Sequence, residues 1–201
     1  MTDPTVVGRS PFVEALGDDF GRLAPALRRH LAQAQGASLL VGGIRHCWRR
    51  GGPLGWLLAR ILRLDFGPLT TSARFEVRNE MLPGGAMLWR RSLRDGATAV
   101  EAFGIVRWDA RRGALVDTLG RRQSIEVELL PRVEEGALRL SSRWQWIRLL
   151  GLRVPLPAIV AGHARVRESA LPGGRILLRL TLSHRCLGEY AGYEAELAEA
   201  E

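Results

Sequence analysis

Apolar and polar residues alternate with a period of two along most of the chain after residue 70, as in β-strands that bury one face. In TSARFEVRNE, for example, Ala73, Phe75 and Val77 fall on one side and charged residues on the other. Similar segments follow between glycine-rich turn signals: AMLWRRSL, TAVEAFGIVRW, GALVDTLG, QSIEVELLP, ALRLSSRWQWI, GHARVRES, GRILLRLTLSHR and GEYAGYEAEL. An earlier strand is predicted in ASLLVGGIRHCWRR, where Gly42 and Gly43 indicate a bulge or a close backbone approach. This spacing predicts about nine or ten antiparallel strands. The strands do not alternate with helices, so a parallel sheet is not expected.

Helices are expected mainly before this region. Ser10, which precedes a proline, is typical of an N-cap and predicts a helix over 11–16. A second helix is expected to begin near Asp19 or at Pro25 and to run to about residue 35. A third is expected over 53–64, where apolar positions follow the i, i+3, i+4 spacing. These positions are Leu54, Leu57, Leu58, Ile61 and Leu62.

The two faces of the predicted strands differ in polarity. In the segment 175–186, one side carries Ile176, Leu178, Leu180, Leu182, His184 and Cys186. In ALRLSSRWQWI, the corresponding side carries Leu138, Leu140, Ser142, Trp144 and Trp146. We therefore expect an α+β fold, with two or three helices packed on a strongly curved antiparallel β-sheet that forms a half-open barrel. Residues 1–9 are expected to be a flexible tail before a single domain over 10–201.

The segment WQWIRLLGLRVPLPAIV, residues 144–160, is strongly apolar. Pro155 and Pro157 exclude a central strand, so an edge segment or a covering loop is expected there. Its aliphatic residues would close the open end of the sheet as the lid of an apolar pocket, or fill that end as a hydrophobic plug. The residues expected to line such a pocket are Trp144, Trp146, Leu178, Leu180, Leu182, Leu58, Ile61, Val154 and Leu156.

The formal net charge is +8, and all 29 basic residues are arginine because the chain contains no lysine. The arginines are scattered, whereas a nucleic-acid site usually shows a basic block or stripe, so nucleic acid is an unfavourable partner. Peripheral membrane contact remains an alternative, because a basic amphipathic helix with Trp56 over 53–64 would suit a membrane interface. No apolar run reaches the roughly 18 residues of a membrane span. The N-terminus lacks an apolar signal core, so a cytoplasmic location is expected.

Familiar catalytic motifs are absent from the sequence. It contains no glycine-rich nucleotide motif, no G-x-S-x-G, no H-E-x-x-H and no Cys/His cluster with zinc spacing. We therefore expect neither a cofactor nor a metal. The candidate catalytic groups are His184 or His163 as a base, with Glu168 or Asp117 as its acidic partner. Against this, a histidine among aliphatic residues is more often a hydrogen-bonded core residue. His30, beside Arg28 and Arg29, is expected at the surface or at the end of a helix.

Several stretches resemble the DUF4166 family, a bacterial domain family of unknown function. They are SPFVEALGDDFGRLAPALRRHL, LWRRSL, GALVDTLGRRQSIEVELLPRVEEGALRL, RWQWIRLLGLRVPLP and LSHRCLGEYAGYEAEL, which together cover most of residues 10–197. Positions similar to the recurrent ones of the family are Trp89, Arg91, Gly120, Trp146, Gly151, Pro155, Pro157, His184, Gly188 and Tyr193. The family pattern has glutamate where Asp117 stands and proline where Arg185 stands. The resemblance implies a stand-alone protein or the partner of a dehydrogenase-like NAD(P)-binding domain. It assigns no catalytic role to any residue.

Three functions fit these expectations. The first is a non-enzymatic binding module for an apolar or amphipathic small molecule such as an acyl lipid, whose acidic head group would meet arginines near the pocket mouth. The second is an enzyme that acts on such a ligand with a histidine–carboxylate pair. The third, which only the resemblance implies, is an interaction subunit for a separate dehydrogenase-like chain.

Overall fold

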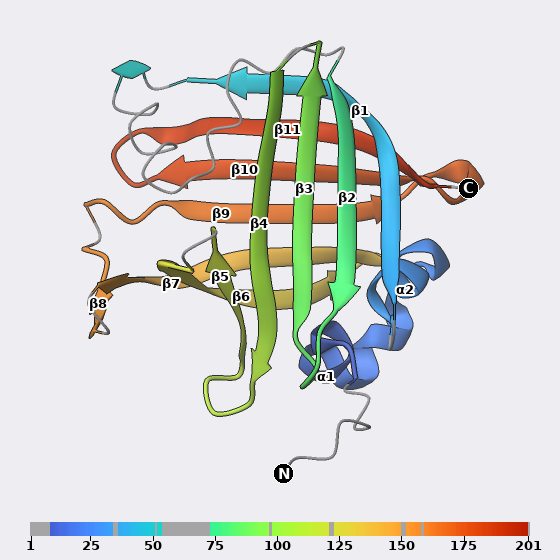
Figure 1. The fold of residues 1–201 in the computed structure, drawn as a ribbon, viewed down its shortest axis with the longest axis horizontal. Coiled ribbons are helices and arrows are strands. Elements are labelled where there is room, and N and C mark those ends of the chain that lie inside the picture. Colours follow the sequence, from blue (N-terminus) through green and yellow to red (C-terminus); the bar gives the residue numbers. More distant parts are fainter. Residues whose placement is uncertain are drawn as a thin grey trace.

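A computed structural model describes residues 9–33, 36–50, 52–53, 73–96, 98–120, 123–149, 152–157 and 159–200 (Figure 1). Within these residues the α-helices are α1 (Pro11–Leu16) and α2 (Pro25–Leu31), and 3-10 turns span Gly17–Arg22 and Pro172–Gly174. The strands are β1 (Ala37–Arg49), β2 (Arg74–Met81), β3 (Met87–Asp95), β4 (Thr98–Asp109), β5 (Ala114–Leu119), β6 (Ile125–Glu134), β7 (Ala137–Leu149), β8 (Leu152–Pro155), β9 (His163–Ala170), β10 (Ile176–His184) and β11 (Gly188–Glu199).

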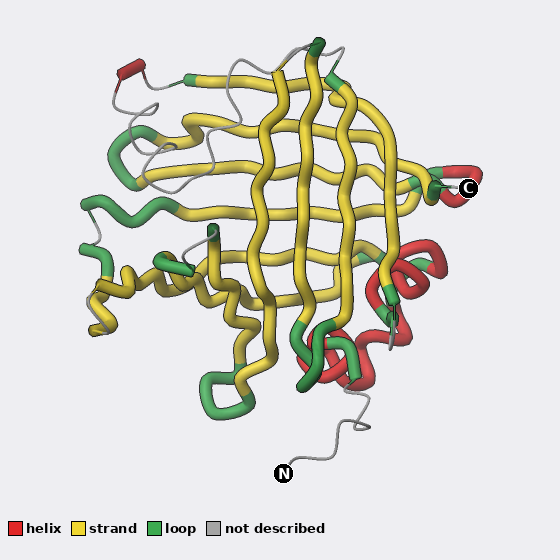
Figure 2. Tube along the Cα trace, viewed as in Figure 1, coloured by secondary structure: helices red, strands yellow, loops and turns green. Residues whose placement is uncertain are grey.

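The strands form one antiparallel sheet that closes into a barrel. Hydrogen bonding follows the order β6-β5-β4-β3-β2-β1-β11-β10-β9-β7, and β7 pairs back to β6, so ten strands form a ring. β8 pairs with the C-terminal part of β7 and lies outside this ring. In Figures 1 and 2, β2, β3 and β4 run nearly perpendicular to β9, β10 and β11. The predicted curved antiparallel sheet is confirmed, but the half-open form is wrong because the β6–β7 hairpin completes the ring.

β1 joins the two strand directions. Residues 37–43 pair with β2, whereas residues 40–49 pair with β11. Gly42 lies where these pairings overlap, and a Cβ atom there would lie 1.9 Å from the carbonyl oxygen of Glu196 on β11. A register shift follows just after Ile44, which increases the local bend. The close backbone approach predicted at the glycine pair is therefore confirmed at Gly42.

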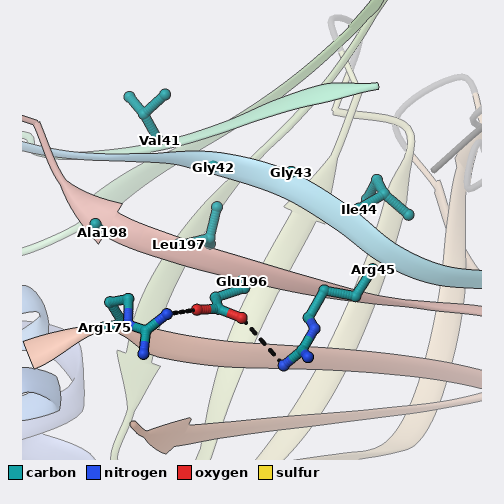
Figure 3. Close-up of a pocket in the computed structure, with 9 residues that line it drawn as sticks. All are labelled: Val41, Gly42, Gly43, Ile44, Arg45, Arg175, Glu196, Leu197 and Ala198. Atoms are coloured by element: carbon teal, nitrogen blue, oxygen red, sulfur yellow. Dashed lines mark hydrogen bonds and ion pairs between the residues drawn. The ribbon is translucent and has the colours of Figure 1, made fainter. Parts of the chain in front are cut away.

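A groove of about 360 Å³ accompanies this bend (Figure 3). Glu196 lies in it between Arg175 and Arg45, and forms an ion pair with each, at 3.0 Å for Arg45. None of its lining residues has a buried side-chain polar atom without a partner. The charges that line the groove therefore already satisfy one another.

Short helices pack against one end of the barrel. Ser10 caps α1 by accepting a hydrogen bond from the backbone N–H of Phe12, and α1 ends at Gly17 with a φ of 53°. Phe12 is fully buried, α1 contacts β4, β5 and β6, and α2 contacts β9. These helices anchor the N-terminal segment to the barrel.

The structure agrees with only part of the helix predictions. The helix over 11–16 is confirmed, and the second begins at Pro25, while Asp19 lies in a 3-10 turn. Of the helix predicted over 53–64, only residue 53 belongs to the described residues. Of the tail predicted over 1–9, only residue 9 belongs to them. The α+β class is imprecise, because the described part of the chain is mostly antiparallel β-structure with two short α-helices.

Alternate residues along the strands point into the barrel and form its core. On β10, Leu178, Leu180 and Leu182 are buried, whereas Arg179 between them is half exposed. On β2, Phe75 and its alternate neighbours are buried in the same way. The predicted separation of an apolar inner face from a charged outer face is therefore confirmed for these strands.

A β-bulge in β7 reverses the faces of its C-terminal part. The partners on β6 move by two positions, from Leu129 to Val127, while those on β7 move by three, from Ser142 to Gln145. One extra residue shifts the alternation by one position, so side chains beyond the bulge change sides. Gln145 is therefore buried and Trp144 is 59 % exposed. The predicted inward orientation of Trp144 is wrong for this reason.

Gly42→Ala is expected to destabilise the fold by about 2–4 kcal/mol, because its methyl group would overlap the Glu196 carbonyl oxygen and push β1 from β11. Gly43→Ala is the matched control, since a Cβ atom there meets only the carbonyl oxygen of Ala73, at 3.8 Å. The control is expected to stay within about 0.5 kcal/mol of the wild type. Urea unfolding followed by tryptophan fluorescence measures both, and equal stabilities would contradict the close approach.

Candidate functional site

Charged side chains project into the barrel from three strands. Arg91 on β3 lies between the buried residues Trp89 and Leu93 and shares their inward direction. Asp117 on β5 and Glu168 on β9 are 6 % and 4 % exposed. Both carboxyl residues pair across their strands with buried aliphatic residues. We call Arg91, Asp117 and Glu168 the interior charge cluster.

The Arg91 guanidinium lies at the end of an aromatic stack. Its central carbon is 4.8 Å from the centre of the Trp89 ring, and Trp89 stacks on Phe12 of α1 with ring centres 5.5 Å apart. The Trp89 indole N–H donates to the sulfur of Met87 at 3.3 Å. The buried Nε of Arg91 has no hydrogen-bond partner among the described residues. Arg91 therefore brings a positive charge and an available N–H into the interior.

Asp117 fits into a notch left by Gly104 on β4. A Cβ atom at Gly104 would lie 2.2 Å from Oδ1 of Asp117. Burial raises the pKa of Asp117 to about 6, although the charge of Arg91 acts in the opposite direction. This Oδ1 atom is buried and receives no hydrogen bond from the described residues. Asp117 is thus a buried acceptor that titrates close to the physiological range.

Glu168 is the second buried carboxyl residue of the cluster. Burial raises the pKa of Glu168 to about 7, and the charge of Arg91 again opposes the shift. Its Oε2 atom is also buried without a hydrogen-bond partner in the described part of the chain. Burial raises the pKa of Tyr193 on β11, while Arg91 lowers it and Glu168 raises it further. Arg91, Glu168 and Tyr193 therefore share one electrostatic environment.

His30 links α2 to β1 and β2 beside this cluster. Its Nδ1 and Nε2 atoms each lie 2.9 Å from a partner, the Ser38 hydroxyl and the Asn79 amide nitrogen. Because an amide nitrogen only donates, Nε2 accepts and Nδ1 carries the proton. Burial, and then the charge of Arg91, lower the pKa of His30 to about 4. His30 lies at the end of a helix, as one of its two predicted positions has it, but its predicted surface position is wrong, because the end of α2 turns the ring into the barrel.

Several buried polar side-chain atoms have no hydrogen-bond partner among the described residues. Besides the Arg91 and carboxyl atoms, the hydroxyl of Tyr190 and Oε1 of Gln145 are buried without a hydrogen bond from the described residues. Buried polar groups in folded proteins are nearly always paired, with protein or with ordered water. The set contains donors and acceptors, so it can hold the polar group of a ligand or bound water.

A signal for this cluster exists in the sequence but is easily missed. The pattern points to Asp117 and Glu168 only as partners of a histidine, and Arg91 enters only through the family resemblance. Yet Arg91 lies two residues from Trp89 and from Leu93, on the apolar side of a predicted strand. A charged residue on such a face needs a buried partner.

The predicted histidine–carboxylate pair does not form. His184 lies at the end of β10, where its Nε2 is 3.0 Å from the carbonyl oxygen of Ile159. Glu168 pairs with Leu178, six residues away along β10, so about 20 Å separate the two at roughly 3.3 Å per residue. His163 is exposed at the start of β9. Glu168 therefore cannot share a proton directly with His184.

The residues predicted to line a ligand pocket fall into different regions. Leu178, Leu180 and Leu182 lie on the inner face of β10. Leu58 and Ile61 lie outside the described residues. Trp144 and Trp146 lie on the outer face of β7, whereas Val154 on β8 and the half-buried Leu156 lie on the opposite side, that of Ile147 and Gln145.

The segment after Trp146 is an edge strand, as one of the two sequence interpretations has it. Trp146 lies between two guanidinium groups, with the central carbons of Arg153 and Arg112 at 3.7 and 5.6 Å from its ring centre. Val154 is 47 % exposed, because β8 lies along the outside of β7. The predicted edge segment is therefore confirmed, whereas the interpretation of this segment as a lid stays a prediction.

An outward-facing carboxylate on β6 holds β8 in place. Glu126 is fully buried and forms ion pairs with Arg112 at 2.8 Å, with Arg148 at 3.0 Å and with Arg153. Burial alone would raise the pKa of Glu126, but the hydrogen bonds from Arg112 and Arg148 and the charge of Arg153 outweigh it and lower the pKa. All partners of this carboxylate come from the chain itself, which indicates a structural role.

The described residues carry no cluster of metal ligands and no membrane-spanning helix. No three histidine, cysteine, aspartate or glutamate side chains there come close enough to hold a metal ion. Within the interior charge cluster, the positive charge of Arg91 opposes the binding of a cation. None of the helices in the described ranges has both the length and the apolar character needed to cross a membrane.

Fold and interior together define a class: a closed antiparallel β-barrel with short helices packed at one end and buried ionisable groups inside. A family model described as a domain of unknown function, DUF4166, matches residues 23–197. The chain belongs to this family, which confirms the resemblance found in the sequence. No curated protein matches the chain.

Two solved structures show a weak similarity to the chain. The acyl-CoA thioesterase II TesB2 from Mycobacterium marinum is 11 % identical over 95 % of this chain and 91 % of that chain, with a TM-score of 0.27. The dehydratase domain of RzxB from Pseudomonas fluorescens is 10 % identical over 93 % and 80 %, with a TM-score of 0.18. Scores this low do not establish a shared fold, so neither structure enters the functional argument.

Glu168→Gln is expected to change how stability depends on pH. Because burial raises the pKa of Glu168 from 4.5 to about 7, the folded state favours the protonated carboxyl group. This contribution is complete below the unfolded pKa and is lost as the pH rises through about 7, by up to about 3 kcal/mol. Urea unfolding should show a smaller loss of stability for the variant between about pH 5 and about pH 8, with a remaining slope from Asp117.

Glu189→Gln provides the matched control, since Glu189 is an exposed carboxylate on β11. The pH dependence of this control should follow that of the wild type. If the Glu168→Gln curve also follows the wild type, the carboxyl group of Glu168 is solvated in the folded protein and the buried cluster is disproved.

Proposed function

We propose that the barrel binds an amphipathic small molecule in its interior, with the ligand's polar group at the interior charge cluster and its apolar part among the core side chains. The observation that carries this proposal is that Nε of Arg91, Oδ1 of Asp117 and Oε2 of Glu168 are buried without hydrogen-bond partners among the described residues. Their surroundings are otherwise apolar, as on the inner face of β10. Few, convergent polar groups in an apolar interior are characteristic of small-molecule sites.

Charge balance restricts the polar group of the ligand. At pH 7 Asp117 is mostly ionised and Glu168 about half ionised, given their pKa values of about 6 and about 7. Together they already neutralise Arg91, so a ligand carboxylate would gain no net attraction. An uncharged hydroxyl, carbonyl or ester group can instead accept from Arg91 and bond to a carboxyl group. We therefore infer a ligand with an uncharged polar end, in place of the acidic head group expected from the sequence.

Displacement of N-phenyl-1-naphthylamine, an uncharged apolar fluorescent probe, tests this proposal. At about pH 7.5, monododecanoylglycerol is expected to displace the probe at lower concentration than dodecanoate, because the cluster has no net positive charge. At about pH 5 the difference should narrow, since protonation of both carboxyl groups leaves Arg91 uncompensated. Failure of the probe to bind, or a preference for dodecanoate at the higher pH, would contradict the proposal.

Arg91→Met locates the polar end of the ligand. The substitution keeps an apolar stem over Trp89 but removes the charge and the N–H groups, so monododecanoylglycerol should bind about tenfold more weakly. Arg90→Met is the matched control, because Arg90 is the neighbouring residue on the exposed outer face of β3. Thermal unfolding verifies that both variants fold. Equal affinities of the two variants would place the ligand elsewhere.

An acid–base enzyme is the second candidate, favoured by two buried carboxyl groups that titrate near neutral pH. Such groups can take up and return a proton under physiological conditions. An Arg91 N–H can stabilise an oxygen on which negative charge develops. The matching chemistry is transfer of a proton from carbon next to a carbonyl to a carboxylate, which leaves the electron pair in an enolate that is then reprotonated.

Proton–deuterium exchange of 2-tetralone, followed by NMR in D₂O, distinguishes the enzyme from the binding module. An enzyme should accelerate exchange next to the carbonyl, and Glu168→Gln or Asp117→Asn should lower that rate by roughly 100-fold or more. Glu189→Gln should leave it unchanged. If exchange is no faster than in buffer, the proposal of an acid–base enzyme is excluded, while the binding proposal is unaffected.

A further inference from the structure

We propose that the β7–β8 hairpin and the turn after it dock on the surface of an anionic lipid bilayer. This inference concerns the outside of the barrel and does not depend on ligand binding in its interior. Its first support is a concentration of exposed apolar side chains, which we call the apolar tip: Trp144, Leu152, Val154 and Ile159 are 59, 69, 47 and 72 % exposed. Among the described residues, the other large apolar side chain that is exposed is Leu39 on β1.

The apolar tip belongs to one hairpin and covers both of its faces. Val154 pairs with Ile147, and the backbone N–H of residue 156 donates to the carbonyl oxygen of Gln145 at 2.9 Å. Val154 therefore shares the side of Ile147, while Trp144 lies on the opposite side because of the β7 bulge. The carbonyl oxygen of Ile159 lies 3.0 Å from His184, which fixes the turn beside the end of β10. Apolar residues on both faces suit a surrounding apolar phase better than a flat protein surface.

Arginines flank the apolar tip and complement an anionic lipid surface. Arg143, Arg148 and Arg153 are 43, 46 and 32 % exposed, whereas their carboxylate partners on β6 are buried. Arg185, next to His184, is also exposed. The charge that faces outward is therefore positive, and exposed tryptophan with arginine is the combination found at membrane interfaces.

The shape of the hairpin favours lipid over a protein partner. β8 is a strand of four residues at one extremity of the molecule, away from α1 and α2 (Figure 1). A stable protein interface engages roughly 20 residues on each side, more than this hairpin offers. Insertion of a few apolar side chains between lipid head groups needs no such area. The ion pairs of Glu126 with Arg148 and Arg153 brace the hairpin for this contact.

Co-sedimentation with vesicles tests the proposal. The full chain is expected to bind phosphatidylcholine vesicles that contain about 30 % phosphatidylglycerol, and to bind pure phosphatidylcholine much more weakly. Trp144→Ser combined with Ile159→Ser should weaken binding to the anionic vesicles by roughly tenfold or more. Arg185→Gln should weaken it by a smaller factor that shrinks at high salt. These side chains are exposed, so unchanged thermal unfolding midpoints are expected and are checked for each variant.

Leu39→Ser is the matched control, because it removes an exposed aliphatic residue far from the apolar tip, and binding should stay within about twofold of the wild type. The proposal is overturned if the wild type does not bind the anionic vesicles, or if the double variant binds as well as Leu39→Ser. It is also overturned if light scattering shows a dimer that the double variant abolishes while vesicle binding persists, since the tip would then be an interface between two copies.

Discussion

The charge of Arg91, a half-buried residue that points into the barrel, sets the electrostatic conditions inside it. A guanidinium group removed from water is costly unless negative charge and hydrogen bonds replace the solvent. The protein supplies a stacked ring, Trp89, and two carboxyl residues, Asp117 and Glu168, but leaves Nε and carboxyl oxygens without partners in the described structure. Burial, and then the same charge, lower the pKa of His30 to about 4 and keep it neutral. The interior charge cluster is therefore nearly neutral at pH 7. Its net charge changes when Asp117 and Glu168 bind or release a proton.

A comparison of two buried glutamates separates structure from candidate function. Glu126 lies under three arginines that bond directly to it, so its pKa falls despite burial. Glu168 feels one arginine, keeps an oxygen without a partner, and has a pKa raised by burial. The first arrangement is complete and fastens β8 to the barrel. The second is incomplete in the way that binding and catalytic sites are.

Because the ring of strands is closed, the interior charge cluster is enclosed by the sheet. Ten strands pair around the barrel, so the inward residues of β3, β5 and β9 face one another. The corner at Gly42 lets β1 serve both strand directions, because a side chain there would collide with the backbone of β11. The bulge in β7 has the opposite effect at its end of the barrel, where it turns Trp144 and the adjoining hairpin into solvent. The proposed interior site and the proposed docking surface thus depend on two separate irregularities in regular strands.

Local patterns in the sequence were sufficient for the elements of this fold. Period-two alternation identified the strands and their apolar face, Ser10 marked the start of α1, and Gly42 marked a close approach, because each depends on neighbours within a few residues. The orientation of Trp144 depended on one extra residue relative to β6, which only the strand pairing reveals. Closure and the meeting of Arg91 with Asp117 and Glu168 were decided by tertiary structure alone. These residues come from strands that are distant along the chain, and no local spacing records which of them face each other across a barrel.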